Sequence, residues 1–473
     1  MLKKIFACSL FLVAFLFLAD ARTNAQILLA RGTLTSSRAG YYKDLSGLNY
    51  NLENGVSANL LGGLGSGMTY VSGNTFLAVP DRGPNAVPFN SLIDDTVSYI
   101  NRFQTIQMEL IPNHGSGLPF TLNPQLVDTT LLHALLPLYY GDGKQYNIGS
   151  GAPRLNNFLF HFFTGRSDNA DPNRSSQYPF DARFDPESIR VSNDGLSVFI
   201  SDEYGPYIYQ FSRFTGERLR AFELPAELFV ANPRTTTDTE SAANTSGRTP
   251  NKGMEGLAIT PDGKTLVGIM QAALLQDAKP AKKLLRIYTV DIASGKTTHE
   301  YAYKLTTGSG VSEITALNSH EFLVDERDGN GLADAPGEAA VVKQIFKIDL
   351  NGATDICCGI NGATALTYAV PKTLFLDIVD VLVNKYGVDP TTIPAKLEGI
   401  TFGPDVRYQG KTLHTFWVAN DNDFLQDYNG VTNSNPNQFF VFGFGDDDLG
   451  GSQYVPQGHG GGFDGGFGFP FLW

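Results

Sequence analysis

Short apolar runs alternate with polar turns along most of the chain, and one combination of them occurs several times. Each copy contains an acidic residue, a short apolar run, a turn, a second apolar run and a closing cluster of polar residues. In the copy "DPESIRVSNDGLSVFISDEYG", which begins at Asp185, the residues Asn193, Asp194 and Gly195 separate the two runs. Alternation with a period of two on both sides of such a turn is typical of a β-hairpin.

The repetition of this unit predicts a β-propeller. Three more copies begin at Gly253, Val311 and Lys396, and a weaker copy, with Gly67 in place of the acidic residue, begins at Gly63. Further strand-like runs follow the closing clusters and give three or four strands per unit. Units of this size repeated along one chain are typical of sheets arranged radially around an axis.

The spacing of the units sets the expected number of blades. Glu187, Glu255, Glu313 and Glu398 are successively 68, 58 and 85 residues apart, and the longest interval contains "PKTLFLDIVDVLVNKYG", which we expect to be an inserted amphipathic helix. Gly67 lies 120 residues before Glu187, about two units, so one further blade is expected between them. The sequence therefore predicts an all-β propeller of six blades, with seven as the alternative, and a short helical insertion.

Both ends of the chain depart from this pattern. Residues 1–25 combine two lysines with a following apolar run that is short for a membrane span, which is typical of a bacterial secretory signal peptide. Residues 450–473 are rich in Gly and Phe and lack alternation, so we expect a flexible tail. Residues 26–449 would then form the propeller of a secreted or periplasmic protein that has no membrane span.

The composition narrows the classes of function. The 473 residues carry a formal net charge of −13, which argues against sequence-independent binding to nucleic acid. Of three Cys, Cys8 lies in the predicted signal peptide, and Cys357 and Cys358 are adjacent, so no disulfide framework is expected. The CxxC, HExxH, GxSxG and P-loop patterns are absent. We expect a monomer whose partner is a small molecule.

The acidic residues of the repeat are expected to meet at one end of the propeller channel. Neighbouring strands of a blade run in opposite directions, so the start of the first strand and the end of the second lie on the same face. The acidic residues at the starts of first strands are Glu187, Glu255, Glu313 and Glu398. The acidic residues at the ends of second strands are Asp81, Asp202, Asp325, Asp421 and Asp423.

Crowded carboxylates repel one another, and a bound cation relieves the repulsion. Ca²⁺ takes six to eight oxygen ligands in flexible geometry, whereas Zn²⁺ and copper prefer His and Cys, of which the chain has few. These nine acidic residues are therefore expected to bind Ca²⁺. The alternative is that each acidic residue accepts hydrogen bonds from the backbone of a neighbouring blade and is purely structural.

Eight segments, in this order, resemble the phytase-like family described as "esterase-like activity of phytase". They are "VPDRGPN", "DPESIRVSNDG", "SDEYGPYIYQF", "NKGMEGLAITPDGKTL", "LLRIYTVDIASG", "TLFLDIVDVL", "KLEGITFGPD" and "WVANDND", within residues 62–442. The resemblance implies a secreted β-propeller that hydrolyses phosphoric esters. Two copies depart from the pattern, because "SEITAL" lacks the Gly that follows Glu elsewhere, and Gln271 replaces an acidic residue.

The resemblance gives the polar residues of the mouth their expected roles toward a small phosphorylated substrate. A carboxylate would accept a proton from water, and cationic side chains would stabilise charge on the phosphoryl oxygens. The residues expected to act in catalysis are Glu203, Glu326, Arg82 and Arg327, and those expected to bind substrate are Lys252 and Lys396.

Two other functions remain open from the sequence. One is a non-catalytic extracellular propeller that binds a ligand or a metal at the same mouth. The other is a metal-dependent lactonase, which needs one central metal held by Glu, Asn and Asp side chains.

Overall fold

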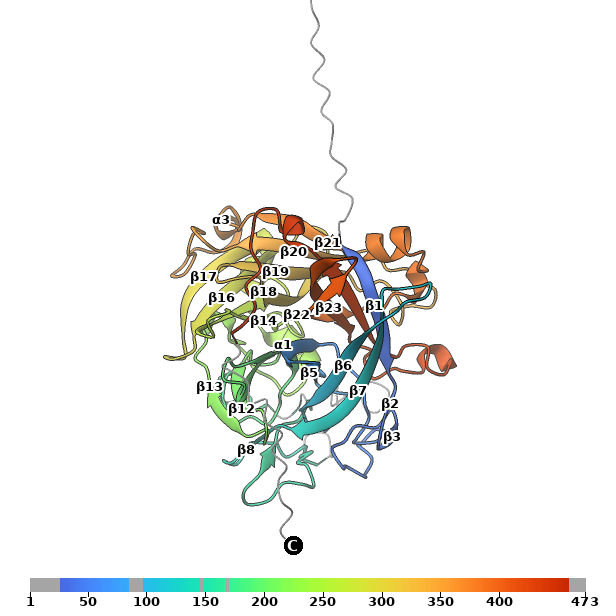
Figure 1. Cartoon of the computed structure of the whole chain (residues 1–473). Helices are drawn as coiled ribbons and strands as arrows, with labels where there is room; N and C mark the ends of the chain where they lie inside the picture. Colours follow the sequence, from blue (N-terminus) through green and yellow to red (C-terminus); the bar gives the residue numbers. More distant parts are fainter. Residues whose placement is uncertain (1–25, 85–96, 145–148, 167, 169, 459–473) are drawn as a thin grey trace, which may run out of the picture.

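The computed structural model describes residues 26–84, 97–144, 149–166, 168 and 170–458. Within them, five four-stranded antiparallel sheets stand around a common axis as the blades of a propeller (Figure 1). Two two-stranded sheets, β2–β3 (Ser36–Ser37, Gly40–Tyr41) and β8–β9 (His133–Ala134, His161–Phe162), lie outside the blades.

Four of the blades follow the chain from their innermost to their outermost strand. The first contains β4 (Gly67–Ser72), β5 (Thr75–Val79), β6 (Arg102–Pro112) and β7 (Phe120–Leu131). The second contains β10 (Pro186–Val191), β11 (Ser197–Asp202), β12 (Ile208–Ser212) and β13 (Arg218–Ala221). The third contains β14 (Met254–Ile259), β15 (Thr265–Met270), β16 (Leu284–Asp291) and β17 (Lys296–Lys304). The fourth contains β18 (Gly310–Ala316), β19 (Glu321–Arg327), β20 (Lys343–Asp349) and β21 (Lys372–Asp377).

The fifth blade closes the ring with strands from both ends of the chain. It contains β22 (Leu397–Tyr408), β23 (Lys411–Asn420), β24 (Asn437–Phe444) and β1 (Ile27–Leu34). Strand β1 pairs antiparallel with β24 and forms the outer edge of this blade, where it lies in blue beside the red strands in Figure 1. The innermost strands contact one another in a closed circle in the order β4, β10, β14, β18, β22 and β4.

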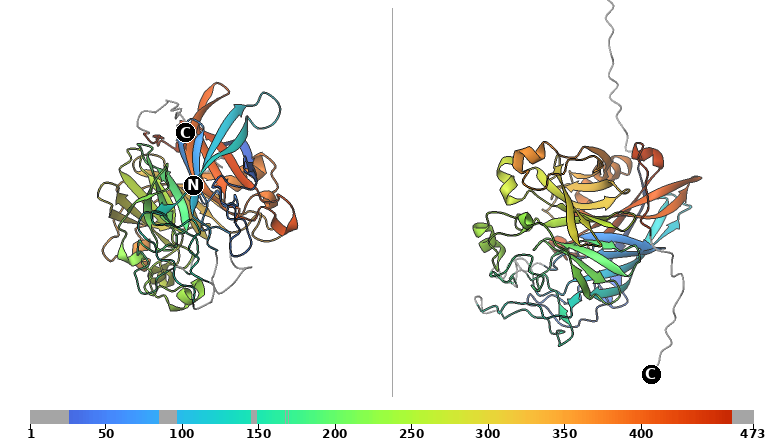
Figure 2. Two further views of the ribbon diagram at one scale, coloured as in Figure 1. Left: turned by 90° about the horizontal axis from the view of Figure 1, so that it is seen from below. Right: turned by 90° about the vertical axis from the view of Figure 1, so that its left-hand side faces the viewer.

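The blade count corrects the expectation of six or seven, because no blade is hidden between β4 and β10 in the described residues. The chain there forms the long hairpin β6–β7, which projects from the ring beside the hairpin β22–β23 (Figure 2). An irregular segment around β8 and β9 follows the hairpin. The 120-residue interval therefore reflects one enlarged blade and an insertion, and the five visible copies of the repeat are the five blades.

The apolar core lies between blades, because each blade packs one face against the next. Five clusters of buried side chains occupy the five interfaces around the ring. Tilted aromatic pairs join blades, as between Phe76 of β5 and Trp417 of β23, whose ring centroids are 4.5 Å apart. Both faces of each sheet are therefore covered by neighbouring blades, which explains why so many strand residues are buried.

The described helices are few and short. They are α1 (Thr237–Ala243), α2 (Leu275–Ala281), α3 (Gly362–Leu366) and α4 (Ile378–Asp380), with the single turns η2 (Ala226–Leu228), η3 (Val381–Lys385), η4 (Pro390–Thr392), η5 (Tyr428–Gly430) and η6 (Asp446–Leu449). The predicted helical insertion begins only at α4, because the "KTLFLD" half of the segment is the outer strand β21. Among the described residues no helix is long and apolar enough to cross a membrane.

An ion pair closes the channel at its centre. The side chain of Arg190 on β10 lies 3.0 Å from the Glu313 carboxylate on β18, and both side chains are buried. The guanidinium also donates to carbonyl oxygens of four innermost strands, those of Met68, Ile189, Ile314 and Ile400. The Glu313 carboxylate accepts from the backbone N–H of Leu257 on the remaining strand, β14. All five blades therefore meet at this one pair.

Residues 450–458, here called the C-terminal strap, cross one end of the channel. The Val455 N–H donates to the Leu317 carbonyl at 2.9 Å, and the Gln457 side-chain amide donates to the Val191 carbonyl at 2.7 Å. These and neighbouring bonds join polar groups of the strap to the turns of three different blades.

Two predicted segments lie outside the described residues. They are the signal peptide, residues 1–25, and the remainder of the Gly- and Phe-rich tail, residues 459–473.

Candidate functional site at the charged channel mouth

The end of the channel opposite the strap is polar, and a β-bulge shapes it in four blades. In the blades that begin with β10, β14 and β22, the bulge falls at Glu187, Glu255 and Glu398, at the start of the innermost strand. In the fourth blade the bulge falls one residue earlier in the repeat, at Ser312. A bulged residue is released from the regular pairing, which re-aims its side chain. All four bulge residues line one cavity of about 190 Å³.

Residues at or directly after the ends of the second strands complete this cavity. In four blades they are Glu203, Gln271, Arg327 and Asp421, and all four line it. The residue directly before each of them pairs with the start of the innermost strand and is absent from the lining. Because successive side chains of a strand point to opposite faces, only one residue of each such pair reaches the mouth in these four blades.

The cavity, here called the charged mouth, contains groups of both signs. Its acidic members are Asp81, Glu187, Glu203, Glu255, Glu398 and Asp421, and its basic members are Arg82, Lys252, Arg327 and Lys396. Ten of the fifteen predicted site residues therefore lie at one mouth, as the sequence indicated. The mouth is a mixed network and not the purely acidic rim that the acidic clusters suggested.

Arg82 is held in place at one side of the mouth. Its Nη1 atom lies 2.9 Å from the Asp185 carboxylate and 2.6 Å from the Asn251 side-chain oxygen. The same atom is 3.7 Å from Glu203, and the Arg82 backbone N–H also donates to Asp185. The guanidinium is thereby fixed beside the cavity that it lines.

The other cations are tied to acidic neighbours in the same way. Lys396 lies 3.0 Å from Asp421 and also pairs with Asp423, and Arg327 pairs with Glu398. Lys252 differs, because its ammonium donates to the uncharged side chain of Gln271 at 3.2 Å.

Two groups of three carboxylates flank Arg82, and either could hold a cation. One contains Asp185, Glu187 and Glu203, and the other contains Asp81, Asp421 and Asp423; within each, one oxygen per residue lies within 4.8 Å of the others. The Glu187 carboxylate accepts no hydrogen bond from the described residues, although it is buried. The buried Oε2 atom of Glu255 is also without a partner. Oxygen-only donors with unfilled acceptor capacity fit a hard divalent cation such as Ca²⁺.

Burial, with repulsion from neighbouring carboxylates, raises the pKa of four acids of the mouth, Glu187, Glu203, Glu255 and Asp421. Burial, with added repulsion from neighbouring carboxylates, holds the pKa of Glu187 and of Glu255 well above the usual range. Burial raises the pKa of Glu203 to about 7, with Asp185 adding to the shift and Arg82 opposing it. Burial likewise raises the pKa of Asp421 to about 7 against the pull of Lys396. Without a cation, the mouth therefore holds protons near neutral pH.

Two of the predicted metal ligands, Glu313 and Asp202, lie away from the mouth for different reasons. In blade four, Ser312 occupies the bulge that Glu fills in its sister blades, so Glu313 lies one residue further along the strand, at the channel centre beside Arg190. A one-residue shift moves a strand side chain to a different face. Asp202 is buried and accepts hydrogen bonds from the N–H groups of Asp185 and Gly205, so its carboxylate holds a turn.

The acidic cluster of blade four also divides. Glu326 is on the face away from the mouth, where it pairs with Lys372 and accepts a hydrogen bond from the Tyr303 hydroxyl at 2.7 Å. The N–H groups of Thr306 and Thr307 donate to the same carboxylate. Asp325 is fully buried beneath the mouth and neither of its oxygens has a partner.

Sequence reasoning missed two residues that hold Arg82 at the mouth, Asp185 and Asn251. Asp185 lies two residues before Glu187, and a spacing of two places side chains on one face of an extended segment, so the signal was present in "DPES". Asn251 comes from the polar loop before β14 and has φ of 54°, and no repeat position marks it.

Residues 59–424 match the model of the phytase-like family, described as esterase-like activity of phytase. An "Uncharacterized secreted protein" of Arthroderma benhamiae is 30% identical over 367 residues, which are 65% of this chain and 68% of that protein. A luciferin-regenerating enzyme is 11% identical with a TM-score of 0.33 and coverage of 84% and 95%. A protein of unknown function from Dyadobacter fermentans is 9% identical with a TM-score of 0.33 and coverage of 88% and 99%. These two structural likenesses are too distant to bear on function.

Proposed function

This chain belongs to the phytase-like family, and from that premise we propose that it is a secreted, Ca²⁺-dependent hydrolase of phosphoric esters that acts at the charged mouth. The observation that carries the proposal is that two groups of three carboxylates lie beside fixed cationic side chains around one small cavity. A site for phosphate needs positive charge, and a site for Ca²⁺ needs several carboxylate oxygens. The charged mouth offers both. Export agrees with the "secreted" description of the Arthroderma benhamiae relative.

The cations of the mouth are suited to a phosphoryl group because they are preorganised. Arg82 is fixed by Asp185 and Asn251, and Arg327 is fixed by Glu398. Donors that are already oriented stabilise charge on phosphoryl oxygens without a further cost of reorganisation. Lys252 has only an uncharged partner, so it is the cation most available to a negatively charged substrate.

The carboxylates assigned to Ca²⁺ are those of Asp185 and Glu187 in one group and of Asp81, Asp421 and Asp423 in the other, with Glu187 as the member least occupied by the protein itself. When bound, the ion would supply positive charge to phosphoryl oxygens and lower the pKa of a bound water. The residues present fit such an ion, since their donor atoms are all oxygens and Glu187 has no other partner in the described chain.

Glu203 is the residue we assign to accept the proton of the attacking water. It lines the mouth, lies 3.7 Å from Arg82 and accepts a 3.3 Å hydrogen bond from the Gly253 N–H. With these contacts alone, the Glu203 carboxylate can still accept a hydrogen bond from a water molecule in the cavity that it lines. Glu326, its counterpart in the sequence-based assignment, is not included because four neighbouring groups occupy its carboxylate.

Hydrolysis of a chromogenic phosphate monoester and diester by the purified protein tests this proposal. Turnover is expected with Ca²⁺, loss of turnover with EDTA, and recovery when Ca²⁺ is restored. Glu187→Gln should lower turnover strongly, and Glu109→Gln, at an exposed position on β6, is the matched control. Absence of turnover at every Ca²⁺ concentration, with Ca²⁺ binding intact, would favour the non-catalytic binding propeller. Turnover of a lactone but of neither phosphate ester would favour the lactonase.

A further inference from the structure

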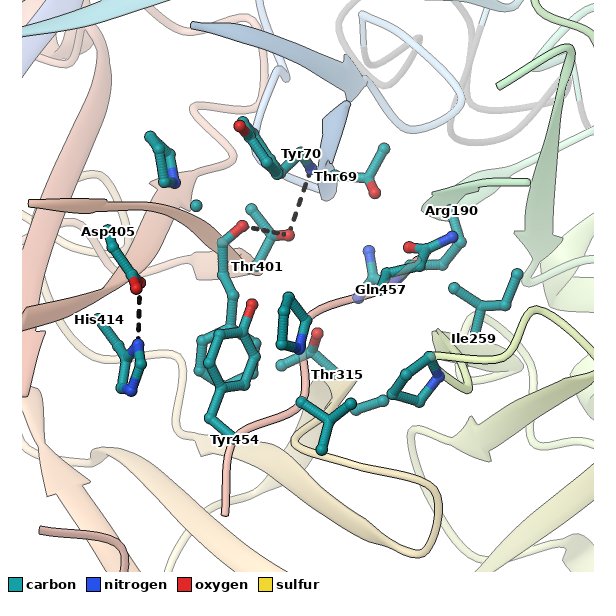
Figure 3. Close-up of a pocket in the computed structure, with 17 residues that line it drawn as sticks. Thr69, Tyr70, Arg190, Ile259, Thr315, Thr401, Asp405, His414, Tyr454 and Gln457 are labelled. Atoms are coloured by element: carbon teal, nitrogen blue, oxygen red, sulfur yellow. Dashed lines mark hydrogen bonds and ion pairs between the residues drawn. The ribbon is translucent and has the colours of Figure 1, made fainter. Parts of the chain in front are cut away.

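The opposite end of the channel contains a second cavity that the proposed function does not use. Its volume is about 350 Å³, and it lies between the ends of the innermost strands and the C-terminal strap. Figure 3 shows Tyr454 and Gln457 of the strap beside Thr401, Thr315 and Arg190 of the innermost strands. We call it the distal cavity. Its volume is at the lower end of the roughly 300–1,000 Å³ typical of small-molecule sites.

The distal cavity is separate from the charged mouth. Arg190 forms part of its wall and is buried in the ion pair with Glu313 at the channel centre. Neither of these two residues lines the charged mouth. A ligand in the distal cavity would therefore not meet the carboxylates proposed to bind Ca²⁺.

The charges around the distal cavity are compensated within the protein. The guanidinium of Arg190 is bound by Glu313 and by carbonyl oxygens. His414 lies between Asp405 at 2.8 Å and Asp446 at 3.1 Å. Since each charged side chain of the lining already has a partner of opposite sign, the cavity is suited to an uncharged ligand.

Several polar atoms of the lining are nevertheless unoccupied. The hydroxyls of Thr69 and Thr315 have no hydrogen-bond partner among the described residues, although both residues are buried. The Tyr454 hydroxyl and the side-chain oxygen of Gln457 likewise have none within the described chain. These oxygens line the cavity without a protein partner, so they can bind a ligand that both donates and accepts hydrogen bonds.

The remaining walls are flat and apolar. Phe402 and Tyr454 pack with ring centroids 4.3 Å apart, and Pro261, Pro404 and Pro456 also line the cavity. Such surfaces suit the C–H face of a saturated ring, while the hydroxyl groups at its rim meet the polar atoms.

We propose that the distal cavity is a second ligand site, for one uncharged polyhydroxylated ring such as a sugar or a cyclitol. The strap supplies one wall, so the site exists only when residues 450–458 are docked. The site is independent of the proposed hydrolase activity, since it shares no residue with the charged mouth.

Binding of methyl glucoside, myo-inositol and inorganic phosphate to the full-length protein tests the proposal by titration calorimetry and ligand-observed NMR. At least one of the two uncharged rings should bind saturably, and the two arms tell sugar from cyclitol. Thr69→Val and Thr315→Val remove hydroxyls that hold nothing in the fold, so both variants should fold. Each is expected to raise the dissociation constant of the ring roughly three- to tenfold, which is the effect of one lost hydrogen bond.

The control variant is Glu187→Gln in the charged mouth, which should leave binding of the uncharged ring unchanged. The proposal would be overturned by no saturable binding of either ring, by binding that both Val variants leave intact, or by binding that Glu187→Gln abolishes. Binding of phosphate alone would also overturn it. Loss of Ca²⁺-dependent turnover with ring binding retained would count against the proposed function and leave this site standing.

Discussion

Arg190 and Glu313 form an ion pair, 3.0 Å between Nη2 and Oε2, through which all five blades of the propeller are joined. Arg190 donates to backbone carbonyls of four blades, its own included, and Glu313 accepts the N–H of Leu257 in the fifth. The pair also separates the charged mouth from the distal cavity. One buried contact therefore sets both the geometry of the ring and the independence of its two ends.

Removal of one member of this pair should destabilise the whole protein. Glu313→Gln or Arg190→Met leaves a buried charge or several backbone carbonyls without a partner, at an expected cost of about 3–5 kcal/mol of unfolding free energy. Urea denaturation would measure it. The double variant should lose less than the sum of the two single losses, since neither charge is then left alone. Strict additivity would contradict a direct pair.

Glu203→Gln should lower turnover and Glu326→Gln should lower stability, although each residue belongs to an acidic cluster at a second-strand end. Glu203→Gln is expected to lower phosphoesterase turnover roughly 100-fold or more, with little loss of stability. Glu326→Gln breaks the pair with Lys372 and disturbs the acceptor of the Thr306 and Thr307 N–H groups, so it should cost about 1–3 kcal/mol. Turnover per folded molecule should remain. Equal loss of turnover in both variants would refute the division of the clusters.

The metal-free protein should become less stable as pH rises from about 4 to above 7. The pKa of Glu203 and of Asp421 is raised in the folded state from 4.5 and 3.8 to about 7. Because the pKa is raised in the folded state, that state binds more protons than the unfolded state in this pH window. The resulting contribution to stability is fully present at a pH below the unfolded pKa and is lost as the pH rises through about 7. Melting curves in EDTA at several pH values measure it. The variant with Glu203→Gln and Asp421→Asn should show a shallower dependence, and an unchanged slope would argue against these groups.

Ca²⁺ should raise the melting temperature, and more at pH 8 than at pH 5.5. Protons and cations compete for the same carboxylates, and a ligand at a hundred times its dissociation constant stabilises the folded state by about 2.7 kcal/mol. Glu187→Gln should reduce the shift, whereas the exposed control Glu109→Gln should not. Identical melting curves in Ca²⁺ and EDTA at pH 8 would show that the mouth is not a Ca²⁺ site.

The repeat made the fold class predictable, but the blade number was not. Alternating runs around turns such as Asn-Asp-Gly and Pro-Asp-Gly specify hairpins locally, so five copies of the repeat could be recognised in the sequence. The sixth blade was inferred from a long interval, and length alone does not distinguish a blade from the long hairpin β6–β7 with an insertion. The helix predicted across "PKTLFLDIVDVLVNKYG" was wrong in its first half, since pairing with β20 makes that half the outer strand β21.

The sequence by itself determined that carboxylates gather at one mouth, because strand direction and strand ends follow from the repeat. It did not determine which members of each cluster face the cavity. A bulge at Ser312 in place of Glu moved Glu313 to the channel centre, and alternation along β19 turned Glu326 away while Arg327 faced the mouth. Pairing register between strands is a tertiary property, and a shift of one residue reverses the face of a side chain. The same holds for the strap, whose docking depends on turns from three blades that only the closed ring brings together.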